Sequence, residues 1–293
     1  HRLMDNILAL HRELKADTYK YDAYEAFKIN DPKPRDIHKA TVRDRLVHHA
    51  LCRMLYPFFD RTFIADSYSC RLRKGTHRAM NRFRSFAYKV SQSHARTCWV
   101  LKCDIRKFFA SIDQRILTDI LARYISDERT NALLAEIIGS FQSTGQGKGL
   151  PLGNLTSQLL VNIYMNEFDR FVKHKLKEKY YVRYADDFVI LSRNRERLAS
   201  LIPRIARFLD TTLALSLHPD KVSIATLASG VDFLGWVHFP DHRVLRTATK
   251  QRMLRRVMGT DNENVVASYV GMLGHGNGKK LNMRLQKSQI AKQ

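Results

Sequence analysis

The chain has 293 residues and carries 50 Lys and Arg against 28 Asp and Glu, which gives a formal net charge of +22 at pH 7. Hydrophobic residues make up 44% of the sequence, enough for the core of one large or two modest domains, and this excludes a chain disordered throughout. The positive surplus favours nucleic acid as a partner, and the lack of any run of about 18 apolar residues predicts no membrane partner and a cytoplasmic protein.

Cysteine usage and the placement of basic residues narrow the class further. None of the four cysteines forms a C-x-x-C pair: Cys52, Cys70, Cys98 and Cys103. This argues against a disulfide scaffold or a zinc ribbon and favours reduced cytosolic thiols. Basic residues interleave with apolar ones over 71–86 and 241–293, which favours folded basic surfaces over loose polybasic arms.

Apolar spacing predicts helices over residues 1–60, with a loop at 30–34 where two prolines exclude helix. Beyond this region strands and helices alternate, and a glycine-rich loop covers 143–153. The expected strands are 97–105, 180–184, 188–191, 221–225 and 231–239, and the expected helices are 113–140, 156–177 and 198–209, the last kinked by Pro203.

The order of these elements between residues 97 and 226 is strand, helices, strand, strand, helix, strand. This is the split βαβ order of a ferredoxin-like sheet, in which the first and third strands are central neighbours. Asp104 ends the first strand, and Asp186 and Asp187 lie in the turn between the second and third. We therefore expect the three aspartates to meet at one end of the sheet.

Such a cluster of carboxylates suits divalent metal chemistry. Aspartates are common in hairpin turns, where they simply satisfy the turn backbone, but here both flanks of the turn are apolar. Adjacent carboxylates repel one another and become tolerable when cations lie between them. Oxygen ligands suit Mg²⁺, and two ions about 3.5–4 Å apart would activate a hydroxyl and stabilise a leaving pyrophosphate.

At this point the motifs resemble those of reverse transcriptases, in order and over roughly residues 30–280. YADD at 184–187 resembles the YxDD box, and KCDIRKFF at 102–109 resembles the first catalytic motif. GLPLGNLTSQ at 149–158 is similar to the template–nucleotide loop, residues 43–78 to the bacterial fingers region, and FLGW at 233–236 to the primer grip. The resemblance implies an α+β right-hand polymerase with a ferredoxin-like palm: N-terminal helices and fingers at 1–96, palm at 97–239 and helical thumb at 240–293.

Two motifs point to a subfamily within the bacterial and phage type. Most reverse transcriptases carry Gln-Gly where this chain has Leu152-Gly153, and the Leu-Gly-x-x-x-Ser-Gln pattern resembles that of diversity-generating retroelements. So does SYVGMLGHGN at 268–277. Group II intron and retron enzymes are near relatives, and the end of the chain soon after the expected thumb counts against a mobile-intron enzyme with a further nuclease domain.

The resemblance also assigns the catalytic roles. Asp104 and Asp186 would ligate both Mg²⁺ ions, for which Mn²⁺ can substitute, with Asp187 as a supporting ligand. Ile105 would lend its backbone carbonyl to the metal, and Lys221 would protonate the leaving pyrophosphate. As an alternative, a lysine at a strand start belongs to the surface.

The nucleotide and primer contacts follow in the same way. Arg71 and Lys74 match the cations that clasp the triphosphate, and Phe109 matches the aromatic gate that rejects a ribose 2′-hydroxyl, unless it simply packs in the core. Gly153 and Gln158 belong to the same nucleotide loop as Leu152, where leucine offers shape without a hydrogen bond and would relax discrimination, unless it only packs beneath the loop. The primer-grip residues are Phe233, Leu234, Gly235 and Trp236.

These features predict an RNA-directed DNA polymerase that makes cDNA from a template RNA, error-prone at template adenines for diversity generation. The alternatives are a group II intron or retron-type enzyme of ordinary fidelity, and a catalytically silent RNA-binding relative. An RNA-directed RNA polymerase is opposed by Phe109. Implied partners are template RNA, primer and cDNA, dNTPs and a small basic oligomeric accessory protein, in the cytoplasm of a bacterial or phage-infected cell.

Overall fold

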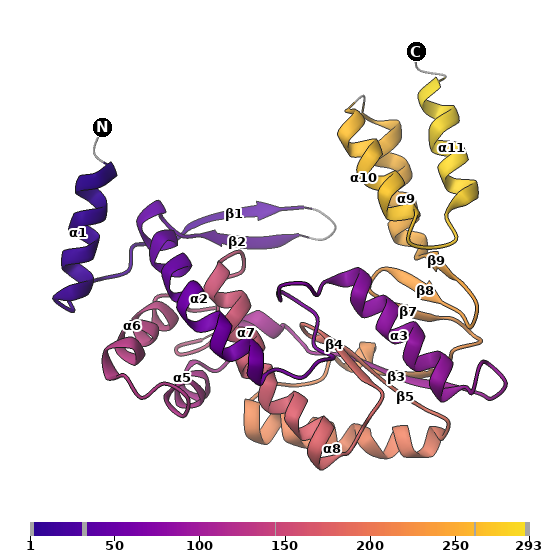
Figure 1. The fold of residues 1–293 in the computed structure, drawn as a ribbon, viewed down its shortest axis with the longest axis horizontal. Coiled ribbons are helices and arrows are strands. Elements are labelled where there is room, and N and C mark those ends of the chain that lie inside the picture. The colour runs from indigo at the N-terminus through magenta and orange to yellow at the C-terminus, as the bar shows by residue number, and fades with distance from the viewer. Residues whose placement is uncertain (1–2, 31–33, 144, 261, 291–293) are drawn as a thin grey trace.

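The computed structural model of the chain describes residues 3–30, 34–143, 145–260 and 262–290. A central sheet with helices on both faces lies between an N-terminal region of helices and a hairpin and a C-terminal group of three helices (Figure 1). The N-terminal elements are α1 (Leu3–Lys15), β1 (Glu25–Ile29), β2 (Arg35–Lys39), α2 (Val42–Thr62) and α3 (Thr76–Val90).

The expectation of helix over residues 1–60 is wrong for residues 25–29 and 35–39. These residues form the antiparallel hairpin β1–β2, which pairs Glu25 with Lys39 and Ile29 with Arg35. Every residue of β1 is exposed, so no burial pattern marks the segment as helix or strand. The predicted loop at 30–34 falls between the two strands, with its central residues 31–33 outside the described range.

The palm sheet has the predicted split βαβ order. Its strands are β3 (Trp99–Asp104), β4 (Tyr181–Tyr184), β5 (Asp187–Ser192) and β6 (Ser223–Thr226), and they lie in the order β4-β5-β3-β6 with every pair antiparallel. The helical elements between them are α4 (Phe108–Ser111), α5 (Gln114–Ala122), α6 (Glu128–Gly139), α7 (Leu155–Arg170), a π-helical turn (Phe171–Lys175), α8 (Arg195–Leu213), which contains Pro203, and a 3₁₀ turn (Pro219–Lys221).

Both faces of this sheet are buried. Leu101, Phe188 and Ile190 pack into a core with α7 and α8, whereas Val100 and Val189, which point to the opposite face, pack against α3. This two-sided burial explains why the central strands are almost continuously apolar. It also fixes the register that brings Asp104 opposite Asp187.

A second small sheet connects the palm to the C-terminal helices. Its strands are β7 (Val231–Phe233), β8 (Trp236–His238) and β9 (Arg243–Leu245), and the helices are α9 (Thr247–Met258), α10 (Glu263–Leu273) and α11 (Lys279–Ile290). A separate apolar cluster joins Trp236 and Leu245 to Met253 and Val257 of α9. The boundary expected between residues 239 and 240 falls in the turn between β8 and β9, and the division into fingers, palm and thumb stays a prediction. Among the described residues, no helix is both long and apolar enough to cross a membrane.

Candidate active site

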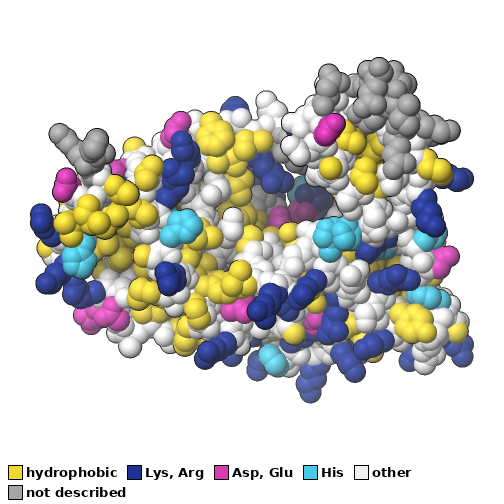
Figure 2. Space-filling model, turned by 45° about the horizontal axis from the view of Figure 1, so that its top comes forward, with side chains coloured by type: hydrophobic (Ala, Val, Ile, Leu, Met, Phe, Trp, Pro, Cys, Tyr) yellow, Lys and Arg dark blue, Asp and Glu magenta, His cyan; other side chains and the backbone are white. Residues whose placement is uncertain are grey.

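Asp104 and Asp187 lie opposite each other on neighbouring strands. Asp104 is the last residue of β3 and Asp187 the first of β5, and the strand register pairs them directly. Asp186 lies in the two-residue turn between β4 and β5 together with Ala185, whose φ is +55°. The three aspartates therefore meet at one end of the palm sheet. Figure 2 shows a hollow between the hairpin and the C-terminal helices, with acidic side chains on its floor.

Two lysines stand beside these carboxylates. Lys221 Nζ lies 3.0 Å from Asp104 Oδ1, and Lys102 Nζ lies 3.8 Å from Asp187 Oδ2. Asp187 Oδ1, by contrast, is shielded from solvent and has no hydrogen-bond partner among the described residues. A buried carboxylate oxygen without a partner is costly unless a proton or a cation satisfies it.

The pKa values of the two aspartates at the turn are also raised. Burial raises the pKa of Asp187 to about 7, an effect opposed by Lys102 and reinforced by the negative charges of Asp104 and Asp186. Burial and the charge of Asp104 also raise the pKa of Asp186, while Lys221 and Arg35 partly offset this effect. The site thus disfavours its own negative charge and favours a bound cation.

This donor set fits Mg²⁺. The described residues hold no preformed group of three acidic, histidine or cysteine side chains arranged around one point. Mg²⁺ needs no such cage, because it commonly takes one or two carboxylates and completes its shell with water and substrate phosphates. Asp104, Asp186 and Asp187 would hold it. Ile105 also pairs with Leu217 in an isolated antiparallel β-bridge. The two hydrogen bonds of this bridge use the Asp104 carbonyl and the Arg106 amide, so neither of them uses the Ile105 carbonyl.

The two predicted triphosphate ligands are engaged within their own loop. The side chain of Arg71 is only 5% exposed, and its guanidinium donates to Asp60 Oδ1 at 2.7 Å and to the carbonyl of Ile64 at 2.7 Å. Lys74 Nζ donates to the carbonyl of Ala65 at 2.7 Å, and burial lowers its pKa. Both cations hold together the segment between α2 and α3, residues 63–75, which is the predicted fingers loop. Their contact with a triphosphate stays a prediction.

Phe109 lies on α4, directly after the catalytic strand. Phe108 is buried, whereas Phe109 is only partly buried and meets Phe108 edge to face at 5.5 Å. The amide of Leu150 donates to the Phe109 carbonyl at 2.9 Å, and the amide of Gly149 donates to the Ile112 carbonyl at 2.8 Å. The start of the nucleotide loop is therefore tied to the same short helix as the predicted gate.

The predicted nucleotide loop is also tied to the β1–β2 hairpin. The amide of His38 donates to the Leu152 carbonyl at 3.2 Å, and Asn154 Nδ2 donates to the His38 carbonyl at 2.9 Å. Gly153 has a φ of +109°, and a Cβ at this position would lie 2.9 Å from Ile37 Cγ2. The motif thus needs its glycine both for backbone conformation and for close approach to β2.

Gln158 lies one turn into α7, where its carbonyl accepts a hydrogen bond from Asn162 Nδ2 at 3.1 Å. Its side chain lines a largely apolar recess of about 610 Å³ between α2, α7 and the fingers loop. The structure therefore places Gln158 at the base of the nucleotide loop, and its contact with a dNTP stays a prediction.

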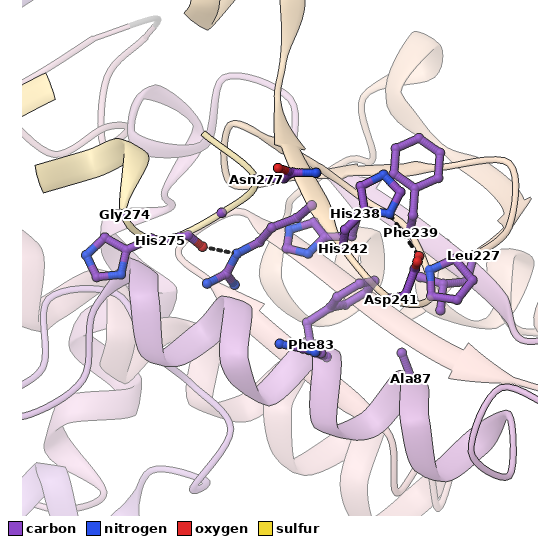
Figure 3. Close-up of a pocket in the computed structure, with 14 residues that line it drawn as sticks. Phe83, Ala87, Leu227, His238, Phe239, Asp241, His242, Gly274, His275 and Asn277 are labelled. Atoms are coloured by element: carbon purple, nitrogen blue, oxygen red, sulfur yellow. Dashed lines mark hydrogen bonds and ion pairs between the residues drawn. The ribbon is translucent and has the colours of Figure 1, made fainter. Parts of the chain in front are cut away.

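The predicted primer grip is a tight hairpin. Leu234 and Gly235 form its turn with φ values of +54° and +84°, while Phe233 and Trp236 on either side are buried. Behind the hairpin lies a recess of about 380 Å³ between α3, the β8–β9 turn and residues 274–277 (Figure 3). Arg243 lines this recess and donates to the His275 carbonyl. The hairpin predicted from sequence is present, and its contact with a primer stays a prediction.

Sequence reasoning missed several charged residues of this region. Arg35 of β2 is near enough to influence Asp186, and Lys102 faces Asp187. Arg183 and Asp169 form a fully buried ion pair beneath the catalytic turn. A single arginine among apolar residues in the strand sequence YVRY was the available signal, because a buried charge needs a partner.

The fold and the paired carboxylates define a palm-type nucleic-acid polymerase domain. Comparison with known families agrees, since residues 28–238 match the model of the reverse transcriptase (RNA-dependent DNA polymerase) family. The chain belongs to this family, and the expectation of a reverse transcriptase domain is confirmed.

Individual relatives are distant. Protein YkfC of Escherichia coli is 26% identical over 86% of this chain and 76% of its own length. The group II intron-encoded protein LtrA of Lactococcus lactis is 23% identical over 77% of this chain, which spans about half of LtrA.

Solved structures share the fold at low sequence identity. Apo telomerase from Candida tropicalis, truncated from its C-terminal domain, superposes with a TM-score of 0.58 at 11% identity, over 83% of this chain and 60% of that one. Telomerase from Candida albicans, in complex with a TWJ fragment of telomeric RNA, superposes with a TM-score of 0.57 at 10% identity, over 84% of this chain and 51% of that one. These likenesses confirm the right-hand α+β polymerase fold.

Proposed function

We propose that the chain copies a template RNA into cDNA at the carboxylate cluster of the palm. The observation that carries this proposal is the direct pairing of Asp104 with Asp187 at the sheet end, with Asp187 Oδ1 buried and without a protein partner. In the reaction the primer 3′-hydroxyl attacks the α-phosphorus of a dNTP and pyrophosphate leaves. Bound Mg²⁺ would lower the cost of forming the attacking oxyanion and of releasing pyrophosphate.

The chain's own residues orient this reaction. The sheet register fixes Asp104 against Asp187, and the turn holds Asp186 beside them. Lys221 holds its ammonium group 3.0 Å from Asp104 Oδ1 with 44% of its side chain exposed, which supports a role as the proton donor to the leaving pyrophosphate. Arg35 adds positive charge from the hairpin side, which suits an incoming triphosphate.

We further propose that synthesis is error-prone opposite template adenines, as in diversity-generating retroelements. The Leu152 backbone is fixed by the bond from His38, and its side chain is partly exposed. A leucine at this position offers the nascent base pair shape alone, so a mismatch leaves no buried polar group unpaired. The similarity to LtrA, a group II intron-encoded protein, favours the alternative of ordinary fidelity.

Sequencing of cDNA made on an adenine-containing RNA template tests this subtype. We expect errors to concentrate opposite adenine and to fall several-fold in Leu152→Gln, in which the side chain can hydrogen-bond to the nascent pair. Leu155→Gln, an exposed position on the same loop–helix junction, is the control. Evenly low error in the wild type would assign the chain to the ordinary-fidelity alternative. Extension with NTPs as good as with dNTPs would contradict the gate role of Phe109.

The proposed partners are the template RNA, the primer and a small basic oligomeric accessory protein. A chain with a net charge of +22 repels another basic protein, so RNA would bridge the two. RNase treatment of a co-purified complex should then release the accessory protein. Retention of that protein after complete digestion would contradict the bridging arrangement.

A further inference from the structure

Arg183 is a buried arginine directly beneath the catalytic turn. It lies on β4, two residues before Ala185, and only 1% of its side chain is exposed. Its guanidinium grips both oxygens of the equally buried Asp169 on α7, with Nε to Oδ1 at 2.7 Å and Nη2 to Oδ2 at 2.6 Å. Burying two charged groups carries a large free-energy cost of desolvation, which a pair that serves only packing would not need.

One remaining donor of Arg183 reaches the turn itself. Nη1 donates to the Ala185 carbonyl at 3.1 Å. This carbonyl belongs to the same planar peptide group as the Asp186 amide, so holding it fixes the plane from which Asp186 projects. Ala185 also has a φ of +55°, a left-handed conformation that is unfavourable for a residue with a Cβ and therefore has to be held by its surroundings.

The same guanidinium also connects the turn to α7 and to the segment between α2 and α3. Nη1 also lies 3.3 Å from Asn162 Oδ1 on α7, and Nη2 lies 3.3 Å from Ser67 Oγ in the fingers segment. Tyr181 supports the pair from the other side, since its hydroxyl donates to Asp169 Oδ1 at 2.7 Å. The N-terminal end of α7 follows the nucleotide loop, so one buried network touches the turn, the helix and the fingers.

We propose that Arg183, oriented by Asp169, is a positioning residue that sets the Ala185–Asp186 peptide and thereby the catalytic carboxylates. The inference rests on the proposed polymerase function. A pair that only stabilised the fold would need no bond to the turn, and its loss would lower the melting temperature without selectively slowing synthesis.

The test compares Arg183→Lys with the same substitution in a second arginine–carboxylate pair of the palm, whose arginine side chain is 54% exposed. Lysine keeps the charge, but a single ammonium cannot hold both Asp169 oxygens and the Ala185 carbonyl. Arg197→Lys is the control, because Arg197 also donates to a carboxylate, that of Glu178, at 2.8 and 3.1 Å, and among the described residues it has no hydrogen bond or ion pair with the turn. Both variants are assayed for primer extension well below their melting temperatures.

In Arg183→Lys we expect kcat to fall about 10- to 100-fold, since small misplacement of catalytic groups carries penalties of this order. The KM for dNTP should change less than about twofold, and the Mg²⁺ concentration for half-maximal rate should rise. Arg197→Lys should match the wild type in all three. Equal kcat in the two variants, or a loss in KM alone, would overturn the inference.

A second comparison applies if Arg183→Lys has no cooperative thermal transition. Asp169→Asn weakens the hold on Arg183, whereas Tyr181→Phe removes one bond to Asp169 and leaves the Ala185 bond in place. We then expect kcat to fall in Asp169→Asn and to stay near wild type in Tyr181→Phe; equal kcat in both would overturn the inference. A wild type without activity under any condition would contradict the proposed function instead.

Discussion

Asp187 shows the cost of gathering carboxylates at one sheet end. Its Oδ1 has no partner among the described residues, and Lys102 is 3.8 Å away from Oδ2. Burial together with the charges of Asp104 and Asp186 raises its pKa to about 7. The folded protein therefore retains a proton on Asp187 at pH values where the unfolded chain, with an ordinary aspartate pKa of about 3.9, has released it.

The raised pKa of Asp187 makes the folded state less stable as the pH rises. Stability from this group is fully present below about pH 4 and is lost as the pH rises toward 7. The side chain in Asp187→Asn cannot ionise. Between about pH 5 and pH 8, the free energy of unfolding of this variant should therefore rise relative to that of the wild type by about 2 kcal/mol, with a corresponding rise in its relative melting temperature. Thermal melts in EDTA measure the gain. A difference that stays constant across this range would contradict the raised pKa.

The residue scale also shows what sequence could predict of the site. Asp104, Asp186 and Asp187 were identifiable because carboxylates follow apolar strands at a spacing that the sheet order brings together. Arg183 and Asp169 were not, because nothing local shows that a strand residue and a helix residue share a buried pocket. Arg35 was missed for a related reason, since only the hairpin places it near Asp186.

At the scale of elements, the nucleotide loop depends on the hairpin β1–β2. Gly153 has a φ of +109°, and an added Cβ would lie 2.9 Å from Ile37 Cγ2 on β2. Gly153→Ala should therefore shift the loop against the hairpin and raise the KM for dNTP several-fold, measured by steady-state primer extension. Gly147→Ala is the matched control, because Gly147 also has a positive φ, +70°, and a Cβ there meets no atom within 4 Å. Equal KM values for the two variants would show that the close approach does not matter.

Burial determines which helices and strands could be predicted from the sequence. The palm strands and α7 were predictable because two-sided burial makes them apolar, and the split βαβ order then fixed the topology. The strands at residues 25–29 and 35–39 were mistaken for helix, because the first of them is exposed throughout and carries no burial pattern. Its apolar residues Phe27 and Ile29 remain 43% and 41% exposed. Backbone pairing rather than side-chain burial therefore defines this element.

At the scale of the whole molecule, the charge of +22 governs association with nucleic acid. If the chain contacts about six phosphates of single-stranded RNA, counterion release gives a slope of about −4 in log K against log salt. Affinity for an RNA oligonucleotide should then fall about 10²-fold between about 50 and 200 mM salt. Fluorescence anisotropy measures this dependence, and Asp186→Asn should share it. A salt-independent affinity would contradict electrostatic binding.

Membership of the reverse transcriptase family and the paired carboxylates converge on one central claim, that the palm aspartates catalyse RNA-templated DNA synthesis. The most direct measurement is extension of a DNA primer on an RNA template by the purified wild-type chain and by Asp186→Asn, with and without Mg²⁺. We predict full-length cDNA from the wild type with Mg²⁺ and dNTPs, and background levels without the metal or with the variant. Equal synthesis by Asp186→Asn, or synthesis independent of a divalent cation, would contradict it.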